Sequence, residues 1–214
     1  MNLILLAPPA AGKGTQSEIL KEKYNLNHIS TGDLLREEIA TNSDLGKEIA
    51  KVINSGGLVN DDLMLKILEN KIKNSNSNGI IFDGFPRNTV QAKMLDELLN
   101  KYNMKIDYVF NLNIEKEVAM KRALGRLLCS KCNTIYNIYR DTFIKEGFCN
   151  KCNSKLDKRD DDNEEAFNKR FDTFFEKTKP LIEFYKEKQI LYDIYCKNKK
   201  EDTFIQIQEI IEKE

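Results

Sequence analysis

The residues whose types and spacing are best suited to chemistry lie near the start of the chain, where Gly-Lys-Gly-Thr at 12–15 follows the apolar run 2–6. A common phosphate-binding loop has the pattern G-x-x-x-x-G-K-[ST], in which backbone N–H groups and the first turn of a helix face the phosphate oxygens. Here Ala7 stands where that pattern has its first glycine, and the threonine comes one place late. Because the prolines at 8 and 9 have no N–H group, residues 10–15 must supply the donors. The alternative is an ordinary connection between a strand and a helix.

Within this loop Lys13 supplies a mobile positive charge for the outer phosphates, and Thr15 supplies a hydroxyl for a phosphate or for hydrated Mg²⁺. Gly12 and Gly14 permit a close approach of the backbone to a ligand. An L-residue forced into the left-handed conformation costs about 1–2 kcal/mol. We therefore expect Ala10 to have a negative φ.

A second group of chemically suited residues is Asp-Gly-Phe-Pro-Arg at 83–87, directly after the apolar run 79–82. In open α/β sheets, ligands bind at the carboxyl ends of parallel strands. Asp83 at such an end is placed to hold a Mg²⁺ water, as carboxylates do in phosphate-loop enzymes, and Arg87 leaves the same turn. Alone, an Asp-Gly turn is usually structural, but a nearby phosphate loop favours the functional interpretation.

Four cysteines form two C-x-x-C pairs, Cys129 with Cys132 and Cys149 with Cys152, separated by sixteen residues. This spacing is a strong signature of a tetrahedral metal site. Four thiolates leave no open coordination position, so the pattern predicts structural Zn²⁺, with iron or a redox role as the weaker alternatives. Cys196 lies outside the pattern and is expected to be a buried apolar residue.

Arginine is rare in this chain, because only seven of the 34 Lys and Arg residues are Arg. Where Lys serves as the general positive charge, the remaining Arg positions are candidates for the planar fork that grips phosphate or carboxylate. Six of the seven fall in or beside the motif segments, namely Arg36, Arg87, Arg122, Arg126, Arg159 and Arg170. Arg140 alone stands apart. The alternative for such charged stretches is a solvated surface.

The composition sets limits on the class of protein. A chain of 214 residues can bury a full core and predicts one domain with room for small insertions. The formal net charge is zero, so nothing suggests nucleic acid or an anionic membrane as the main partner. The apolar run 3–11 lacks the positive segment of a secretory signal, and no run approaches the length of a membrane span. We expect a soluble, cytoplasmic protein.

Hydrophobic patterns predict alternating strands and helices. Short apolar runs predict strands at 2–6, 79–83, 107–114 and 190–195. Helical spacing and capping residues predict helices at 13–24, 30–40, 43–57, 61–73, 89–103, 115–126, 163–188 and 203–213. Such alternation is typical of an α/β fold with a parallel sheet and flanking helices.

Five details qualify this pattern. Gly56 and Gly57 should end the third helix, Asn60 should cap the fourth, and Pro180 should kink or break the long helix at 163–188. Residues 126–162 interrupt the alternation and predict a small inserted β subdomain. His28, the only histidine, is expected to serve packing or a turn hydrogen bond.

Taken in order, these motifs resemble adenylate kinase, specifically the form with a long zinc-binding lid. The resemblance covers essentially the whole chain: GKGTQ, STGDLLR, GGLV, DGFPR with Gln91 downstream, LGR, the cysteine pairs and RDDDNEEAFNKR. In that family Lys-Gly-Thr is normal, so Gly14 before Thr15 is no defect. The departures are Ala7 and Ala10, where the family usually has glycine, and Leu127, where a second arginine often follows.

The resemblance implies the phosphate-loop nucleoside monophosphate kinase fold and reversible transfer, ATP + AMP to two ADP, with Mg²⁺ and a structural Zn²⁺. It implies donor-binding residues Ala10, Ala11, Gly12, Lys13, Gly14, Thr15, Arg126, Ile135, Tyr136 and Lys199. It implies AMP-binding residues Thr31, Arg36, Gly57, Leu58, Val59, Gly84, Phe85, Pro86, Arg87, Gln91, Arg159 and Arg170. Catalytic roles fall to Lys13, Asp83, Arg87, Arg122, Arg126, Arg159 and Arg170.

The same resemblance implies three parts: a core of 1–29, 60–125 and 163–214, an AMP-binding flap of 30–59 and a zinc-binding lid of 126–162. The expected partners are the nucleotides ATP, AMP and ADP, with no nucleic acid and no membrane, and the expected state is a monomer.

Two other functions stay open at this point. A sister kinase for another nucleoside monophosphate, or one using GTP as donor, shares most motifs, although Gln91 offers an amide for an adenine edge. A zinc-ribbon module that binds nucleic acid on a nucleotide-binding scaffold is the alternative from another class. Its support is weak, because residues 126–162 carry eight basic and six acidic side chains.

Overall fold

The computed structural model describes residues 1–54, 59–73, 78–132, 134–158, 162–197 and 199–213. Within these ranges a parallel sheet has the strand order β2-β3-β1-β4-β8. Its strands are β1 (Leu3–Leu6), β2 (Asn27–Ser30), β3 (Ile80–Asp83), β4 (Tyr108–Asn113) and β8 (Leu191–Tyr195). The helices are α1 (Lys13–Tyr24), α2 (Thr31–Ala40), α3 (Asp44–Asn54), α4 (Asp61–Lys73), α5 (Thr89–Asn100), α6 (Lys116–Leu124), α7 (Glu164–Glu187) and α8 (Lys200–Ile211). The predicted α/β fold is confirmed.

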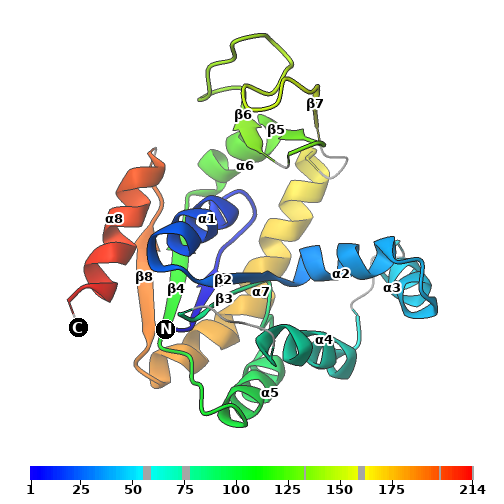
Figure 1. Cartoon of the computed structure of the whole chain (residues 1–214). Coiled ribbons are helices and arrows are strands. Elements are labelled where there is room, and N and C mark those ends of the chain that lie inside the picture. Colours follow the sequence, from blue (N-terminus) through cyan, green and yellow to red (C-terminus); the bar gives the residue numbers. More distant parts are fainter. Residues whose placement is uncertain (55–58, 74–77, 133, 159–161, 198, 214) are drawn as a thin grey trace.

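The central strands are buried on both faces, as their continuous apolar runs predict. Along β1, Ile4 and Leu6 join one core cluster, while Leu3 and Leu5 join another. The first cluster is completed mainly by α4, α5 and α7, and the second by α1 and α8. Figure 1 shows α2 and α3 extending to one side of this layered core, away from α8. The core therefore fixes the strand ends on which the candidate site is built.

Helix starts are set by side chains that accept backbone hydrogen bonds. Ser30 accepts from Asp33 N–H at the start of α2, and Asn60 accepts from Asp62 N–H at 2.8 Å before α4. The predicted cap at Asn60 is thus confirmed. Each such bond satisfies a donor that a helix leaves unpaired in its first turn. The predicted end of the third helix at Gly56 and Gly57 lies outside the described residues.

Two sequence-based predictions differ from the structure. β2 was not predicted, because it is a polar edge strand in which only Ile29 is buried. Pro180 was expected to kink or break the long helix; α7 is continuous across it, so the break does not occur, and the kink stays a prediction. Leu181 and Tyr185 beyond the proline are fully buried, and their packing offsets the roughly 3 kcal/mol that an interior proline costs.

Residues 126–162, here called the insert, carry the predicted β subdomain. It is an antiparallel sheet of β5 (Arg126–Cys129), β6 (Ile135–Asn137) and β7 (Leu156–Asp157), in the order β6-β5-β7. Figure 1 shows it beyond α6 and the start of α7, at the end of the molecule toward which the parallel strands run. The insert therefore faces the edge of the sheet that carries the phosphate-loop sequence.

Candidate active site

The loop after β1 turns sharply before α1 begins at Lys13. Ala10 has φ 61° and Gly12 has φ 102°, both in the left-handed region. The expectation of a negative φ at Ala10 is therefore wrong. Left-handed residues at alternate positions curl the backbone, and such curls make anion-binding concavities from successive N–H groups. The strain at Ala10 is offset in part by packing against the cluster of Ala119, Ala123, Phe167 and Phe171.

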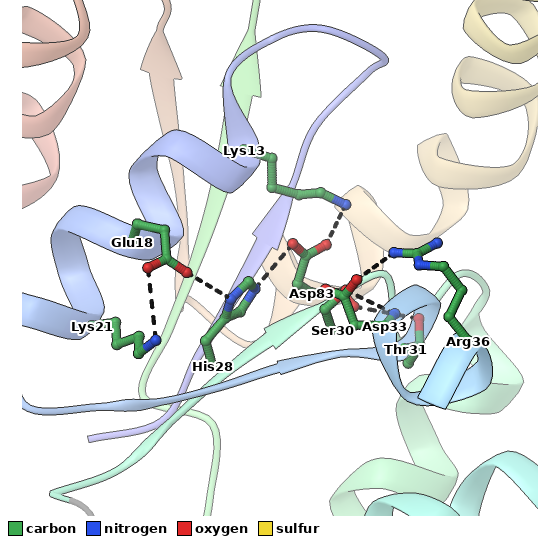
Figure 2. A network of polar contacts seen from close by, with 9 residues as sticks. All are labelled: Lys13, Glu18, Lys21, His28, Ser30, Thr31, Asp33, Arg36 and Asp83. Carbon is green, nitrogen blue, oxygen red and sulfur yellow. Dashed lines mark hydrogen bonds and ion pairs between the residues drawn. The ribbon is translucent and has the colours of Figure 1, made fainter. Parts of the chain in front are cut away.

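Lys13 and Asp83 form an ion pair at the carboxyl ends of β1 and β3. Lys13 Nζ lies 2.6 Å from Asp83 Oδ1, and the parallel register places Leu5 beside Asp83. Figure 2 shows the Lys13 side chain reaching from the start of α1 to the carboxylate. The sequence-predicted lysine and carboxylate are thus together at the edge where α/β folds bind ligands.

The only histidine contacts the other oxygen of this carboxylate. His28 Nε2 lies 3.1 Å from Asp83 Oδ2, and His28 Nδ1 lies 3.6 Å from Glu18 Oε1 (Figure 2). The side chain of Asp83 is 12 % exposed. Burial disfavours its charge, but the hydrogen bond with His28 and the charge of Lys13 lower the pKa of Asp83 to about 2. His28 was not predicted here, since its strand was missed; the parallel pairing of β2 with β3 is the signal that would have found it.

Thr31, Gly84 and Arg87 lie around the backbone of the same turn. Thr31 Oγ1 donates to the Asp83 carbonyl at 3.4 Å, and Arg87 Nε donates to the Gly84 carbonyl at 2.8 Å. Gly84 has φ 82°, and an added Cβ would lie 2.7 Å from Thr31 Oγ1. The position thus requires glycine both for its conformation and for the close approach of Thr31. Predicted residues from α2 and the β3–α5 turn are therefore brought together.

The guanidinium groups near this turn repel one another. Burial lowers the pKa of Arg87, although its side chain still reaches solvent, and the charge of Arg170 on α7 lowers that pKa further. The charge of Asp83 opposes these two effects and raises the pKa of Arg87. Arg36 on the exposed side of α2 pairs with Asp33, and that hydrogen bond lowers the pKa of Asp33 against the opposing effect of burial.

Gln91 is buried, and both the oxygen and the nitrogen of its amide form a hydrogen bond within the protein. Its Oε1 accepts from Arg87 N–H at 2.6 Å, and its Nε2 donates to Asp61 Oδ1 at 2.7 Å. Asn88 caps α5 by accepting from Gln91 N–H at 2.9 Å. Gln91 therefore fixes the Arg87 backbone relative to α4.

The remaining predicted acceptor-side residues differ in placement. Phe85 and Pro86 are buried beneath the turn, and Val59 packs at the edge of the core. The predicted residues Gly57, Leu58 and Arg159 lie outside the described residues.

Two predicted arginines are held near the base of the insert. Arg126 Nε donates to Asp162 Oδ2 at 2.8 Å, and a second bond joins the same two groups, so the pair is bidentate. The Asp162 side chain is 1 % exposed. Arg122 Nη2 donates to the Lys197 carbonyl at 2.7 Å, which ties α6 to the β8–α8 connection. Arg122 thus lies toward α8, and its place beside the transferring phosphoryl stays a prediction.

A cavity of about 340 Å³ lies between α1, α8 and the insert. Its wall contains the predicted residues Thr15, Ile135 and Tyr136, together with Lys200 next to the predicted Lys199. It also contains Arg140, Asp141, Thr142 and Asn150, which were not predicted as site residues. For Arg140, rarity among the basic residues was the one sequence signal. The cavity begins where the phosphate loop ends and has the size of a small-ligand site.

The four predicted cysteines form one cluster in the insert. Their Sγ atoms all lie within 4.8 Å of one another, with Cys129 and Cys149 buried. The separations include 3.3 Å for Cys129–Cys152 and 3.5 Å for Cys132–Cys149. Four thiolates at about 2.3 Å around one tetrahedral ion stand roughly 3.8 Å apart, so the cluster fits Zn²⁺ closely.

Hydrogen bonds around Cys149 favour the thiolate that a metal requires. Tyr136 Oη lies 3.4 Å from Cys149 Sγ, and Lys151 N–H donates to that sulfur at 3.3 Å. Burial opposes ionisation, but the Tyr136 hydroxyl and the backbone N–H groups of Cys152 and Lys151 lower the pKa of Cys149 to about 6. All five cysteines lie in the described ranges as free thiols, and Cys196 is partly buried, not fully as predicted.

Among the helices of the described ranges, none combines the length and the apolar character that crossing a membrane requires.

Comparisons with known proteins agree with this geometry. The family model described as adenylate kinase matches residues 5–190. An adenylate kinase of Archaeoglobus fulgidus is 40% identical over 214 residues, covering 100% of this chain and 99% of its own. One of Thermodesulfovibrio yellowstonii is 41% identical over 100% of both chains. One of Alkaliphilus oremlandii is 39% identical over 208 residues, which is 97% of this chain and 96% of its own.

Proposed function

The chain belongs to the adenylate kinase family of enzymes, and from that premise we propose that it catalyses reversible, Mg²⁺-dependent transfer of a phosphoryl group between ATP and AMP, giving two ADP. The observation that carries this proposal is the convergence of Lys13, Asp83, Thr31 and Arg87 at the carboxyl ends of β1 and β3. Phosphoryl transfer needs in-line positioning and neutralisation of charge more than it needs an acid or a base. A cluster of cations around one carboxylate is suited to that chemistry.

The donor nucleotide occupies the side of the site formed by the phosphate loop and the insert. The curled backbone of residues 10–15 binds its phosphates, and Lys13 neutralises the outer ones. Its nucleoside enters the cavity lined by Thr15, Ile135, Tyr136 and Lys200. Arg126, poised at the base of the insert, reaches the phosphates from the opposite side.

The acceptor occupies the side formed by α2 and the turn after β3. Thr31 is the first residue of α2, and Arg36 lies further along the same helix. Arg87 lies in the turn after β3. The mutual repulsion of Arg87 and Arg170 is relieved when a phosphate lies between them. Gln91 accepts from Arg87 N–H and donates one Nε2 hydrogen to Asp61, so its second Nε2 hydrogen is the donor that would contact a base.

Asp83 and Thr15 are the residues that would hold hydrated Mg²⁺ with the donor phosphates. The ion, when bound, supplies positive charge that offsets the negative charge of the transferring group. Asp83 stays ionised down to acidic pH because its pKa is about 2. Lys13, paired with it at 2.6 Å, exchanges this partner for phosphate when a nucleotide binds.

The insert acts as a lid whose fold depends on Zn²⁺ bound by Cys129, Cys132, Cys149 and Cys152. Four thiolates close the coordination sphere, so the role of the ion is structural. Residues 30–59 form the flap over the acceptor, and the rest of the chain is the core. Closure of lid and flap before transfer excludes water, which otherwise competes with AMP as the acceptor.

The test is turnover measured by chromatography with Mg-ATP and one of AMP, GMP, CMP or UMP in separate reactions. We expect ADP to form only with AMP. Turnover of another monophosphate would move the assignment to a sister kinase, and absence of turnover with every acceptor would contradict it.

A matched pair of variants separates the site from the fold. Lys13→Gln removes the charge at the phosphate loop and should reduce kcat by at least a hundredfold. Lys21→Gln changes an exposed lysine of the same helix, which pairs only with Glu18 in the described residues. It should leave kcat and the melting temperature unchanged, whereas Lys13→Gln should remain folded with a lowered melting temperature, because it removes a partner of the Asp83 carboxylate.

A further inference from the structure

Two hydroxyl groups of the insert approach the cysteine cluster from the side of β6. Thr134 Oγ1 lies 3.1 Å from Cys132 Sγ, and Tyr136 Oη lies 3.4 Å from Cys149 Sγ. Each C-x-x-C pair therefore has one sulfur in contact with a side-chain hydroxyl. The two sulfurs are neighbours within the cluster, 3.5 Å apart.

The alternation of side chains along a strand explains why both hydroxyls face the same way. Thr134 directly precedes β6 and Tyr136 is its middle residue, so the two stand on one face of an extended segment. Ile135 between them is 45% exposed, whereas Tyr136 is buried in one cluster with Cys129 and Cys149. The face of β6 opposite to Ile135 is thus the face turned toward the sulfurs.

The fold of the insert holds this face in place. Cys129 N–H donates to the Thr134 carbonyl at 3.0 Å, next to the antiparallel pairing of β5 with β6. The ring of Tyr136 packs against the ring of Phe143, with the two centroids 5.6 Å apart. Backbone pairing and ring packing therefore position the two hydroxyls independently of their contacts with sulfur.

The direction of each hydrogen bond follows from the chemistry of a metal ligand. A cysteine that binds a metal is a thiolate without a proton, so the hydroxyl must be the donor. Tyr136 Oη accepts from Asn150 N–H at 3.0 Å, and its own proton is then available to Cys149 Sγ. A hydrogen bond to an ionised acceptor is about twice as strong as one between neutral groups.

The charge of the cluster explains what these donors contribute. Four thiolates carry more negative charge than one Zn²⁺ neutralises, and Cys129 and Cys149 are buried, where excess charge is costly. Hydrogen bonds from outside the ligand set disperse this charge and orient the ligands. Their removal typically lowers metal affinity by about 10- to 100-fold.

We propose that Thr134 and Tyr136 are positioning residues for the metal: each donates its hydroxyl proton to one ligand sulfur, and together they determine how tightly the insert retains Zn²⁺. The inference rests on the proposed function in one respect, namely that the four cysteines bind Zn²⁺. It goes beyond those four ligands, because neither hydroxyl is itself a ligand of the ion.

The test uses the whole chain loaded with an equimolar amount of Zn²⁺ and measures competition for the ion with the chromophoric chelator pyridylazoresorcinol. Thr134→Val and Tyr136→Phe each remove one hydroxyl with little change of shape. The affinity for Zn²⁺ should fall by about 10- to 100-fold in each variant. Thr134→Ser keeps a hydroxyl and should restore most of the affinity. Tyr139→Phe is the matched control, because Tyr139 lies in the same insert and is 58% exposed, and it should retain Zn²⁺ as the natural sequence does.

A second measurement separates a hydrogen bond to sulfur from an effect on the fold of the insert. Co²⁺ in place of Zn²⁺ gives a charge-transfer band from sulfur to metal, whose energy depends on how firmly the sulfur holds its electrons. A sulfur that has lost an O–H donor releases electrons more readily. The band should therefore move to longer wavelength in Thr134→Val and in Tyr136→Phe, and it should stay in place in Thr134→Ser and in Tyr139→Phe.

The outcomes distinguish this inference from the proposed function. If the natural sequence and the two hydroxyl-free variants retain Zn²⁺ equally well, the inference is wrong and the zinc-binding insert stands. If the affinity falls but the Co²⁺ band does not move, the two residues serve only the fold of the insert, and the inference is again refuted. If the natural sequence holds no Zn²⁺ in native mass spectrometry, the inference fails together with the structural role of zinc, whereas turnover of ATP and AMP tests the catalytic assignment separately.

Discussion

Replacement of Asp83 by Asn tests the electrostatic centre of the site, because the structure gives both a magnitude and a pH dependence. The pKa of Asp83 is lowered from 3.8 to about 2 in the folded protein. One pKa unit corresponds to about 1.4 kcal/mol, so the ionised carboxylate stabilises the fold by about 2 kcal/mol at pH 7. The low exposure of Asp83 means that solvent screens little of this energy.

The sign follows from the lowered pKa. A carboxylate with a depressed pKa contributes stability above its unfolded pKa and loses that contribution as the pH falls through its folded pKa. The stability difference between the natural sequence and Asp83→Asn should therefore be constant from pH 7 to about pH 5. It should shrink between about pH 4 and pH 2. Asn has the same shape, so packing around the site is unchanged.

The assay is urea unfolding of both proteins at pH 7, 5, 4 and 3, with equal metal content. Asp172→Asn is the matched control, because that carboxylate forms an exposed pair with Lys116 and should cost no more than about 1 kcal/mol at any pH. An Asp83→Asn protein as stable as the natural sequence at pH 7 would refute the reasoning. A difference that stays constant down to pH 3 would also refute it, since the loss would then not come from ionisation.

Three further predictions concern the loop, the base of the insert and the cysteine cluster. Gly125→Ala places a Cβ 2.5 Å from Tyr139 Cδ2, so calorimetry should show a loss of about 1–3 kcal/mol that Gly125→Ala/Tyr139→Ala partly restores. Ala10→Gly relieves the left-handed strain at φ 61°, and urea unfolding should show equal stability or a gain of up to about 1 kcal/mol; a clear loss would contradict the strain. Cys149→Ser should reduce zinc content, measured by native mass spectrometry, and lower the melting temperature, whereas an unchanged melting temperature after zinc removal would contradict a structural role.

The sequence predicted the elements whose physical causes are local. Continuous apolar runs located β1, β3, β4 and β8, and capping residues located the starts of α2 and α4. The missed strand β2 and the absence of a break at Pro180 both arose where tertiary packing overrides local preference. β2 pairs at the sheet edge with mostly polar residues, and α7 passes through Pro180 because the residues beyond it are buried.

The site shows the same division between local and tertiary causes. Lys13 and the four cysteines were found from short spacing patterns, and Asp83 from its position at the end of an apolar strand. Ala10 was misjudged because the benefit of its left-handed turn comes from the loop as a whole and from packing against α6 and α7. His28 and Arg140 were missed because each reaches the site from an element whose position depends on the assembled sheet or insert.

What no motif could supply is the partner of each cation. Lys13 pairs with Asp83 from another strand end, and Arg126 pairs with the nearly fully buried Asp162 from the far end of the insert. A partly buried cation without a counter-charge loses hydration and gains no interaction in return. These carboxylates therefore stabilise the charged forms of the guanidinium and the ammonium and fix their orientation. Under the proposed function, a phosphate chain, which carries more negative charge than one carboxylate, would compete with Asp83 and Asp162 for these cations. The free energy of nucleotide binding is therefore a difference between the ion pairs that these cations form with carboxylates of the protein and those that they would form with phosphates. The sequence identifies the cations, which take part in both sets of ion pairs, but not their partners within the protein.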